Sequence, residues 1–561
     1  MRQLDWIVLI GFVVFTILYG IIKGRGSKTT RSYMLADKTM PWYAVALSIM
    51  ATQASAITFV SATGQAYSDG MRFVQVYFGL PIAMVILCAV AVPLYHRLNV
   101  YTAYEYIERR FDLKTRTLTS VIFLVQRGLS DGLSVYASAI ILSVILGWNV
   151  YWTLRMIGAA VVIYSVAGGV KGVNWNDFQQ FLVIMGGMVV ALFMTIYLLP
   201  SDISFRDAVS IAGVMGRLNA VDYSFDLSNR YNFWSGLIGG LFVSLSYFGT
   251  DQSQVQRYLT AKSIAQSRLG LLFNGLAKIP MQFFILFIGA MIFVFYQFVT
   301  PPLFFNPQEV SSLRFGQEFQ QMEKQYSQAS DFKKAQIRKW LEARKSGDEN
   351  QQAIAKTDLI QANTKATEIR NKAIDLIKKT NPQANTNDTN YIFLTFVTHY
   401  LPAGLVGLVI VVVFAATMSS MSSELNSLAT TTVIDLYKRM IFKNGADRHY
   451  LIAGKIATAC WGIFAVSFAE RLSHLGSLLE AVNILGSLFY GTVLGIFMLG
   501  FFFKKVGGTA TFIGALVGEA IVLYLFKFTT ISFLWYNVFG CTAVIACALL
   551  LSTFRTSPRS V

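Results

Sequence analysis

Four serines within five positions are the first candidate binding feature of this sequence. They are Ser419, Ser420, Ser422 and Ser423, inside the segment FAATMSSMSSELNS at residues 414–427. On a helix, Ser419, Ser422 and Ser423 share one face, because residues three and four positions apart are neighbours. Hydroxyl oxygens are hard, neutral ligands that suit a small alkali cation, which must bind and then leave. A serine in an apolar helix often bonds the backbone four residues earlier instead, but this density of hydroxyls favours a cation site.

A second polar segment, ATQASAITF at residues 51–59, lies within an apolar stretch. Small and hydroxylated residues allow a membrane helix to unwind where neighbouring protein satisfies the freed backbone groups. Carbonyl oxygens released in this way can coordinate a cation. The same small residues can instead serve close helix packing, and the sequence favours neither interpretation.

Ionisable residues inside apolar segments are costly, so each of them is informative. These residues are Arg127, Asp131, Asp177, Asp251, Lys278, Glu424 and Glu480. Arg127 and Asp131 are four positions apart, a spacing that allows them to pair on one helix. We expect Asp177 and Asp251 to lie close enough to the membrane surface to be hydrated. Lys278 is the hardest to explain without a function, because it lies several residues inside its segment.

The elements that carry these residues belong to a chain whose solvent is the lipid bilayer. Of 561 residues, 54% are hydrophobic and only 14% are charged, and the mean hydropathy is +0.51, which is too apolar for a soluble surface. Runs of about 20 apolar residues, the length that crosses a bilayer, recur along the chain. We predict an all-α polytopic membrane protein with thirteen transmembrane helices, at residues 5–22, 41–66, 73–94, 117–147, 150–167, 174–199, 233–251, 267–300, 391–436, 449–470, 476–503, 507–527 and 531–553.

Lysine and arginine in short loops predict the orientation of these helices. They gather after the first and third spans and in every second loop thereafter, so we expect those loops to be cytoplasmic. The N-terminus then lies outside and the tail with Arg555 and Arg559 lies in the cytoplasm. The protein is expected in the plasma membrane, or in the inner membrane of a bacterium. The net charge of +17 is dispersed over loops, which argues against a nucleic-acid partner.

The composition changes sharply at residues 301–390, between the expected helices one to eight of residues 1–300 and helices nine to thirteen of residues 391–561. The stretch is rich in Lys, Glu, Gln, Ala and Asn, and a turn is expected at residues 346–348. We predict a soluble helical hairpin on the extracellular or periplasmic side. It could bind a partner protein, still unknown, or control solute access, and a solvated elaboration of a loop is the simpler interpretation.

The sequence contains no motif that predicts catalysis or an organic cofactor, so we expect that the protein is not an enzyme. The four cysteines lie in apolar segments, where a thiol behaves as a small hydrophobe. The four histidines have no metal-ligand spacing. The segment GRGSKT at residues 24–29 lacks the spacing of a phosphate-binding loop.

Several motifs resemble those of the sodium/solute symporter family, particularly its sodium/glucose cotransporter-like members. They are the serine-rich segment continuing to residue 438, YFGTDQSQVQR at 247–257, GGVKGVNWND at 168–177, YEYIERRF at 104–111 and AKIPM at 277–281. They cover nearly the whole chain outside the insert. The resemblance implies a LeuT-like core of two inverted five-helix repeats, spans two to six and seven to eleven, with extra helices at both ends.

The resemblance also implies two sites for sodium, the coupling ion and the only metal expected. The first site would use the backbone carbonyls or side-chain hydroxyls of Ala51, Ala54, Ala416, Ser419 and Ser420. A second site, found in some relatives, would be formed by Asp177, Ser419, Ser422 and Ser423. All of these positions carry the required oxygen, so two sodium ions per cycle are expected.

The positions that match the sugar site of family members are Gln53, Thr58, Gln75, Tyr77, Tyr247, Phe248, Lys278 and Asn483. Gln75 and Tyr77 replace an expected carboxylate. The implied function is sodium-coupled symport of a small polar solute, a sugar or a related compound, by alternating access. If Arg127 faces the cavity, it could instead pair with an organic acid such as a sialic acid or a monocarboxylate. A chain with many spans could also be a proton-coupled symporter, a channel or a sensor that does not transport.

Overall fold

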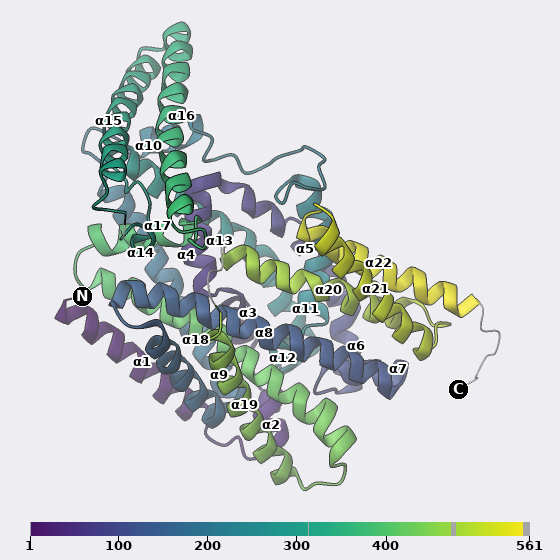
Figure 1. The fold of residues 1–561 in the computed structure, drawn as a ribbon. Helices are drawn as coiled ribbons and strands as arrows, with labels where there is room; N and C mark the ends of the chain where they lie inside the picture. Colours follow the sequence, from purple (N-terminus) through teal and green to yellow (C-terminus); the bar gives the residue numbers. More distant parts are fainter. Residues whose placement is uncertain (1, 312, 473–477, 554–561) are drawn as a thin grey trace.

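The computed structural model describes residues 2–311, 313–472 and 478–553, which form a bundle of long helices (Figure 1). In this part of the chain, ten helices are long and apolar enough to cross a membrane, and the bent pair α3 (Trp42–Gln53) and α4 (Ala56–Asp69) makes up to eleven. The predicted all-α membrane architecture is therefore confirmed. The ten are α1 (Gln3–Gly24), Met71–Leu98, α8 (Leu113–Leu146), α9 (Val150–Tyr197), α13 (Ile264–Phe298), Leu405–Ile441, α19 (Asp447–Ala469), α20 (Leu478–Phe502), α21 (Gly508–Phe528) and α22 (Phe533–Thr553).

Two of these spans contain several elements, and shorter helices connect the rest. Met71–Leu98 comprises η2 (Met71–Tyr77), α5 (Leu80–Ala89) and α6 (Ala91–Leu98). Leu405–Ile441 comprises α18 (Leu405–Thr431) and η4 (Thr432–Ile441). The connecting helices are α2 (Thr30–Leu35), η1 (Ala36–Lys38), α7 (Ala103–Arg110), α10 (Phe205–Val214), α14 (Pro307–Val310) and α17 (Thr389–Tyr400).

The expected count of thirteen spans is not confirmed. The expected spans at 150–167 and 174–199 both belong to α9, within which Gly169 leaves the helical conformation (φ 57°, ψ −166°). The expected span at 233–251 is the shorter apolar helix Ser235–Gly249. The expected span at 391–436 is divided into α17 and α18, because Pro402 cannot donate a helical hydrogen bond and Gly404 takes a φ of 87°.

Two further breaks in the described helices lie next to α18. α3 and α4 differ in direction by 59°, with Ala54 at the break outside the helical region (φ −89°, ψ 61°). η3 (Ser235–Gly239) and α11 (Gly240–Gly249) precede a second break at Thr250 and Asp251, after which α12 (Gln252–Leu259) begins. α18 packs against α3, α4 and α12. A helix end leaves backbone groups without helical partners, so these breaks bring free polar groups to α18.

The insert forms a helical hairpin of α15 (Gln317–Ser346) and α16 (Glu349–Thr380), with Gly347 in the left-handed conformation at the turn (φ 75°). Figure 1 shows the hairpin projecting from the bundle at the end where α1 begins. Arg338 forms an ion pair with Asp202 (3.1 Å), and Arg370 forms one with Asp388 (2.6 Å). The hairpin is thus held to the bundle at its side and at its base. The basic tail with Arg555 and Arg559 lies outside the described residues.

Candidate functional site

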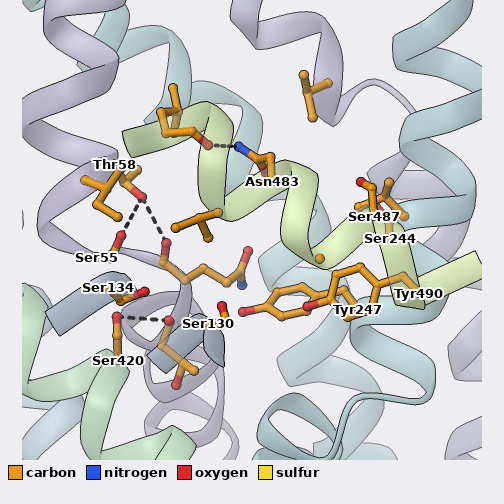
Figure 2. A pocket seen from close by; sticks show the side chains of 18 of the residues that line it. Ser55, Thr58, Ser130, Ser134, Ser244, Tyr247, Ser420, Asn483, Ser487 and Tyr490 are labelled. Atoms are coloured by element: carbon orange, nitrogen blue, oxygen red, sulfur yellow. Dashed lines mark hydrogen bonds between the residues drawn. The ribbon is translucent and has the colours of Figure 1, made fainter. Parts of the chain in front are cut away.

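A cavity of about 170 Å³ lies inside the bundle between the two helix breaks. Side chains of α3, α4, α8, α11, α13, α18 and α20 line it. Figure 2 shows Ser55 and Thr58 on one side facing Tyr247 and Tyr490 on the other, with Ser420 near the serines of α8. Hydroxyl groups, amides and aromatic rings thus meet in one enclosed space, as in a site that orients a small polar ligand.

The structure brings eight of the nine expected solute-binding residues to this cavity. The eight are Gln53, Thr58, Tyr77, Arg127, Tyr247, Phe248, Lys278 and Asn483. Gln75 does not line the cavity and is fully buried. Its Nε2 donates to the carbonyl oxygen of Tyr231 (2.9 Å), and its Oε1 accepts from the backbone N–H of Asp222 (3.0 Å). Both ends of this amide therefore bind the backbone of the loop before η3.

Lys278 on α13 reaches the cavity without a carboxylate beside it. Its side chain is 1% exposed, and Nζ lies 5.3 Å from the centroid of the Tyr77 ring. Within the described residues it makes no hydrogen bond or ion pair. Contact with an aromatic face compensates only part of the cost of burying an ammonium group. Lys278 is therefore a strong hydrogen-bond donor available to a ligand.

Arg127 on α8 is engaged by protein groups. Its guanidinium group forms ion pairs with Asp251 and with Glu424 (3.0 Å), and it donates to the hydroxyl of Tyr490 (2.6 Å). The pair with Asp131 that the spacing allows is not among the ion pairs of the described residues. The expected hydration of Asp177 and Asp251 is wrong, since they are 0% and 2% exposed. Both carboxylates lie where helices pack together, and each has a bonding partner from a distant part of the chain.

The residues expected at the first sodium site lie where α18 meets the α3 break. The hydroxyl of Ser419 lies 3.1 Å from the carbonyl oxygens of both Ala51 and Ala416. The hydroxyl of Ser420 donates to the carbonyl oxygen of Thr52 (3.1 Å). Ala54 is fully buried at the break. Carbonyl and hydroxyl oxygens thus converge from two helices, which is the donor set that a dehydrated alkali cation requires.

The residues expected at the second sodium site are also close together. Asp177 Oδ2 accepts hydrogen bonds from Ser48 (2.6 Å) and Ser423 (3.1 Å). Its Oδ1 is buried and has no hydrogen-bond partner in the described part of the chain. The hydroxyl of Ser422 bonds the carbonyl oxygen of Ser419 (3.2 Å), one turn away. An orphaned carboxylate oxygen beside several hydroxyls suits a bound cation.

Two residues of this region were not identified from the sequence. They are Ser48, which bonds Asp177, and Thr52, whose hydroxyl lies 3.0 Å from that of Ser423. Both lie on α3, four positions apart, on the face that carries Ala51 toward α18. A helical projection of residues 42–53 that began from Ala51 would have selected them.

Comparisons with known proteins identify the relatives of this architecture. The model of the sodium:solute symporter family matches residues 33–318 and 373–518. A sodium/glucose cotransporter of Vibrio parahaemolyticus is 28% identical, over 93% of this chain and 86% of that protein. A sodium/sialic acid symporter of Proteus mirabilis is 25% identical, over 97% of this chain and 93% of that protein. The solved structure of a Na⁺-coupled sialic acid symporter, in a substrate-bound outward-open state, is 23% identical and covers 100% of both chains with a TM-score of 0.77. This likeness confirms the predicted LeuT-like fold.

Proposed function

This chain belongs to the sodium:solute symporter family, and we propose that it uses the entry of sodium to accumulate a small polar organic solute, with two sodium ions in each cycle. One observation carries the proposal. Ser420 lines the cavity and also bonds the carbonyl oxygen of Thr52 at the α3 break. The expected ion site and the solute cavity therefore share a wall, so an ion that orders this wall also completes the solute site.

Coupling follows from the position of the ion ligands on two separate helices. Sodium bound between Ala51 on α3 and Ser419 on α18 would stabilise the arrangement in which these helices are close. An ion can drive a transition only through its different affinity for the two states. Each positive charge moved across a potential of 100 mV contributes about 2.3 kcal/mol. Two ions therefore concentrate the solute far more steeply than one ion.

The lining of the cavity supports a hydroxyl-rich solute, a sugar or a related compound. Thr58 and Ser130 offer hydroxyl groups, and Gln53 and Asn483 offer amides. The ring of Tyr247 presents an apolar face on another side. A sugar ring has the complementary features, because it combines donors and acceptors on its edge with an apolar face.

A carboxylate-bearing solute is the second candidate, and Lys278 is the observation that favours it. The ammonium group of Lys278 lacks an anion among the described residues, whereas Arg127 is already paired with Asp251 and Glu424. A solute carboxylate would therefore bind Lys278 rather than Arg127. Such an ion-paired hydrogen bond is stronger than one to a neutral hydroxyl.

Uptake into proteoliposomes tests the proposal. The purified chain is reconstituted, an inward sodium gradient is imposed, and accumulation is followed for labelled sugars, sialic acids, monocarboxylates and amino acids. We expect one class to accumulate and its members to compete with one another. Equal accumulation when choline replaces sodium contradicts sodium coupling. Binding of a solute without any accumulation would instead indicate a sensor.

A further inference from the structure

The base of the hairpin buries a cation that no carboxylate compensates. Lys333 on α15 is 5% exposed, and within the described residues it makes no hydrogen bond or ion pair. The charged groups close enough to act on it are Arg217, in the loop after α10, and Arg370 on α16. Both of these groups are positive. A buried ammonium group that faces only other cations is costly, so a negative charge at this place would stabilise the docked hairpin.

Arg217 also forms no ion pair with any residue that the structure describes. Its Nη1 donates to the carbonyl oxygen of Ser68, and its guanidinium carbon lies 4.4 Å from the centroid of the Phe293 ring. Asp69 is the carboxylate that acts on it, but this side chain is exposed and lies outside ion-pair distance. The Nε of Arg217 is buried and has no hydrogen-bond partner in the described chain. One strong donor of this second cation is therefore unused.

Arg370, in contrast, has a counter-ion. It donates to both carboxylate oxygens of Asp388 (2.6 and 2.8 Å), and Oδ2 of this carboxylate also accepts from the backbone N–H of Phe305 (2.7 Å). Asp388 is thus engaged at both oxygens and neutralises one of the three cations. The charges of Lys333 and Arg217 remain without a paired carboxylate at the base of the hairpin, whose helix α15 packs against α13 (Figure 1).

A third unused donor lies on the same face of α15 as Lys333. Ser330 is three positions earlier on this helix, and its hydroxyl oxygen is buried without a partner among the described residues. An ammonium group, a guanidinium N–H and a hydroxyl group thus lack an acceptor in one region of the hairpin base. Buried polar groups are almost always hydrogen-bonded, and an anion is the ligand that satisfies all three donors at once.

We propose that a small inorganic anion, chloride, binds between Lys333 and Arg217 and fastens the hairpin to the bundle. It would accept from Lys333 Nζ, from Arg217 Nε and from the Ser330 hydroxyl, and charge-assisted hydrogen bonds of this kind are strong. The burial of these donors favours a monovalent ion over sulfate or phosphate, because a doubly charged ion loses far more hydration energy. Lys333 lies in the stretch that the family model leaves unmatched, and none of the three residues belongs to the proposed sodium or solute sites.

The anion site connects the hairpin with a helix that lines the solute cavity. Arg217 bonds the last turn of α4 through Ser68, and α4 carries Thr58 into the cavity. An anion that binds only the docked state lowers the population of the open hairpin by the factor 1 + [anion]/Kd. The anion concentration thus sets how firmly the hairpin rests on this end of α4. An effect of the anion on uptake rests on the proposed symport, whereas the anion site itself does not.

Limited proteolysis of the purified full chain at neutral pH tests the site, with potassium chloride compared with potassium gluconate at constant ionic strength. At a chloride concentration ten times its Kd, we expect cleavage of the hairpin to slow about tenfold. Lys333→Met removes the buried charge, so its cleavage should be slow in both salts. Lys339→Met, at an exposed position of the same helix, should respond to chloride like the unaltered protein. Equal cleavage of the unaltered protein in both salts, or chloride protection that persists in Lys333→Met, overturns the proposal.

Broadening of the chlorine NMR line by the purified proteins measures chloride binding directly. Arg217→Gln keeps Lys333 and removes the second cation, so the Kd for chloride should rise at least tenfold, the loss expected for one charged hydrogen bond. Lys333→Met should abolish the broadening, and Lys339→Met should retain it. Bromide should displace chloride and sulfate should not. Broadening that is equal in all four proteins, or that sulfate suppresses as well as bromide does, overturns the proposal.

Neither measurement depends on transport. Uptake that ignores sodium contradicts the proposed symport and leaves the chloride results unaffected, so the two failures can be distinguished.

Discussion

Ser419 on α18 donates a hydrogen bond of 3.1 Å to the carbonyl oxygen of Ala51 on α3, across 368 positions of the chain. The acceptor lies in the last turn before the α3 break. A hydroxyl and a carbonyl oxygen thus meet between two helices that belong to different repeats in the LeuT-like fold. In the proposed mechanism, an ion bound at this contact most directly affects the relative position of the repeats.

Removal of this hydroxyl should weaken sodium binding. Ser419→Ala deletes one oxygen of the proposed first sodium site and leaves the backbone carbonyls in place. We expect the sodium concentration for half-maximal uptake to rise about tenfold, which corresponds to about 1.4 kcal/mol. Thr417→Val is the matched control, because the Thr417 hydroxyl bonds the carbonyl oxygen of Val413 (2.7 Å) within α18. A sodium curve that shifts equally in both variants argues against a ligand role for Ser419.

The proposed second sodium site predicts a change in the cooperativity of sodium binding. Asp177→Ala removes the orphaned carboxylate oxygen and the acceptor of Ser48 and Ser423. We expect weaker sodium dependence and a lower Hill coefficient for sodium in initial-rate uptake. Ser48→Ala keeps the carboxylate and removes one of its donors, so its effect should be smaller. An unchanged sodium curve in Asp177→Ala rejects the second site.

Lys278 predicts how the solute is held. Lys278→Gln keeps a hydrogen-bond donor and removes the charge, so the KM for a carboxylate-bearing solute should rise by about tenfold to a hundredfold, as expected for a charged hydrogen bond. The KM for a neutral sugar should rise less. Lys262→Gln, at an exposed position, is the control. Unaltered KM values for both solute classes would show that Lys278 does not contact the solute.

Lys333 in the hairpin predicts that docking of the insert depends on pH. Burial, reinforced by the nearby cations Arg217 and Arg370, lowers the pKa of Lys333 from 10.5 to about 8. Below pH 8 the lysine is protonated both in the docked hairpin and in an open one. Docking then carries the full cost of burying the charged ammonium group, about 3 kcal/mol. As the pH rises from 8 toward 10.5, the docked state binds fewer protons than the open state, so docking becomes more stable.

Limited proteolysis of the hairpin at several pH values measures this effect. Cleavage between α15 and the bundle should slow as the pH rises from about 8. Lys333→Met should be resistant at every pH, because it removes the buried charge. Lys339→Met, at an exposed position of the same helix, should behave like the unaltered protein. A pH dependence that persists in Lys333→Met assigns the effect to another group.

The expected orientation can be tested with thiol reagents that do not cross membranes. In a background with Cys460, the exposed native cysteine, changed to alanine, Ser346→Cys at the hairpin turn should be labelled in intact cells. Lys505→Cys, in the loop between α20 and α21, should be labelled only after the cells are permeabilised. The reverse pattern contradicts an N-terminus and insert on the outside.

The helical architecture could be predicted because apolar length and loop charge are local properties of the sequence. The break within residues 51–59 was one of two interpretations of its small residues, and the structure has a break at Ala54. The division between α17 and α18 had a visible signal in Pro402 and Gly404, although the apolar run conceals it. The kink at Gly169 interrupts a continuous helical pattern. Its close approach to Tyr33, which lies 2.7 Å from a Cβ placed there, is visible only in three dimensions.

The choice of partners within the site could not be predicted from local spacing. Arg127 has Asp131 one turn away, yet it pairs with Asp251 and Glu424, which are 124 and 297 positions distant. The packing of α8 against α18 and against the start of α12 decides which carboxylates pair with Arg127. Helix periodicity does not encode this packing. For the same reason the burial of Asp177 and its bond to Ser48 became evident only in three dimensions.

The hairpin of α15 and α16 has a practical consequence for imaging the transport cycle. A bundle enclosed by detergent offers few features by which noisy particle images can be oriented. Each of these helices is about 45 Å long, at 1.5 Å per residue, and the pair projects from the bundle (Figure 1). Most of the hairpin, residues 319–372, lies in the stretch that the family model leaves unmatched. The protein thus carries its own alignment marker for electron microscopy, without a bound antibody fragment.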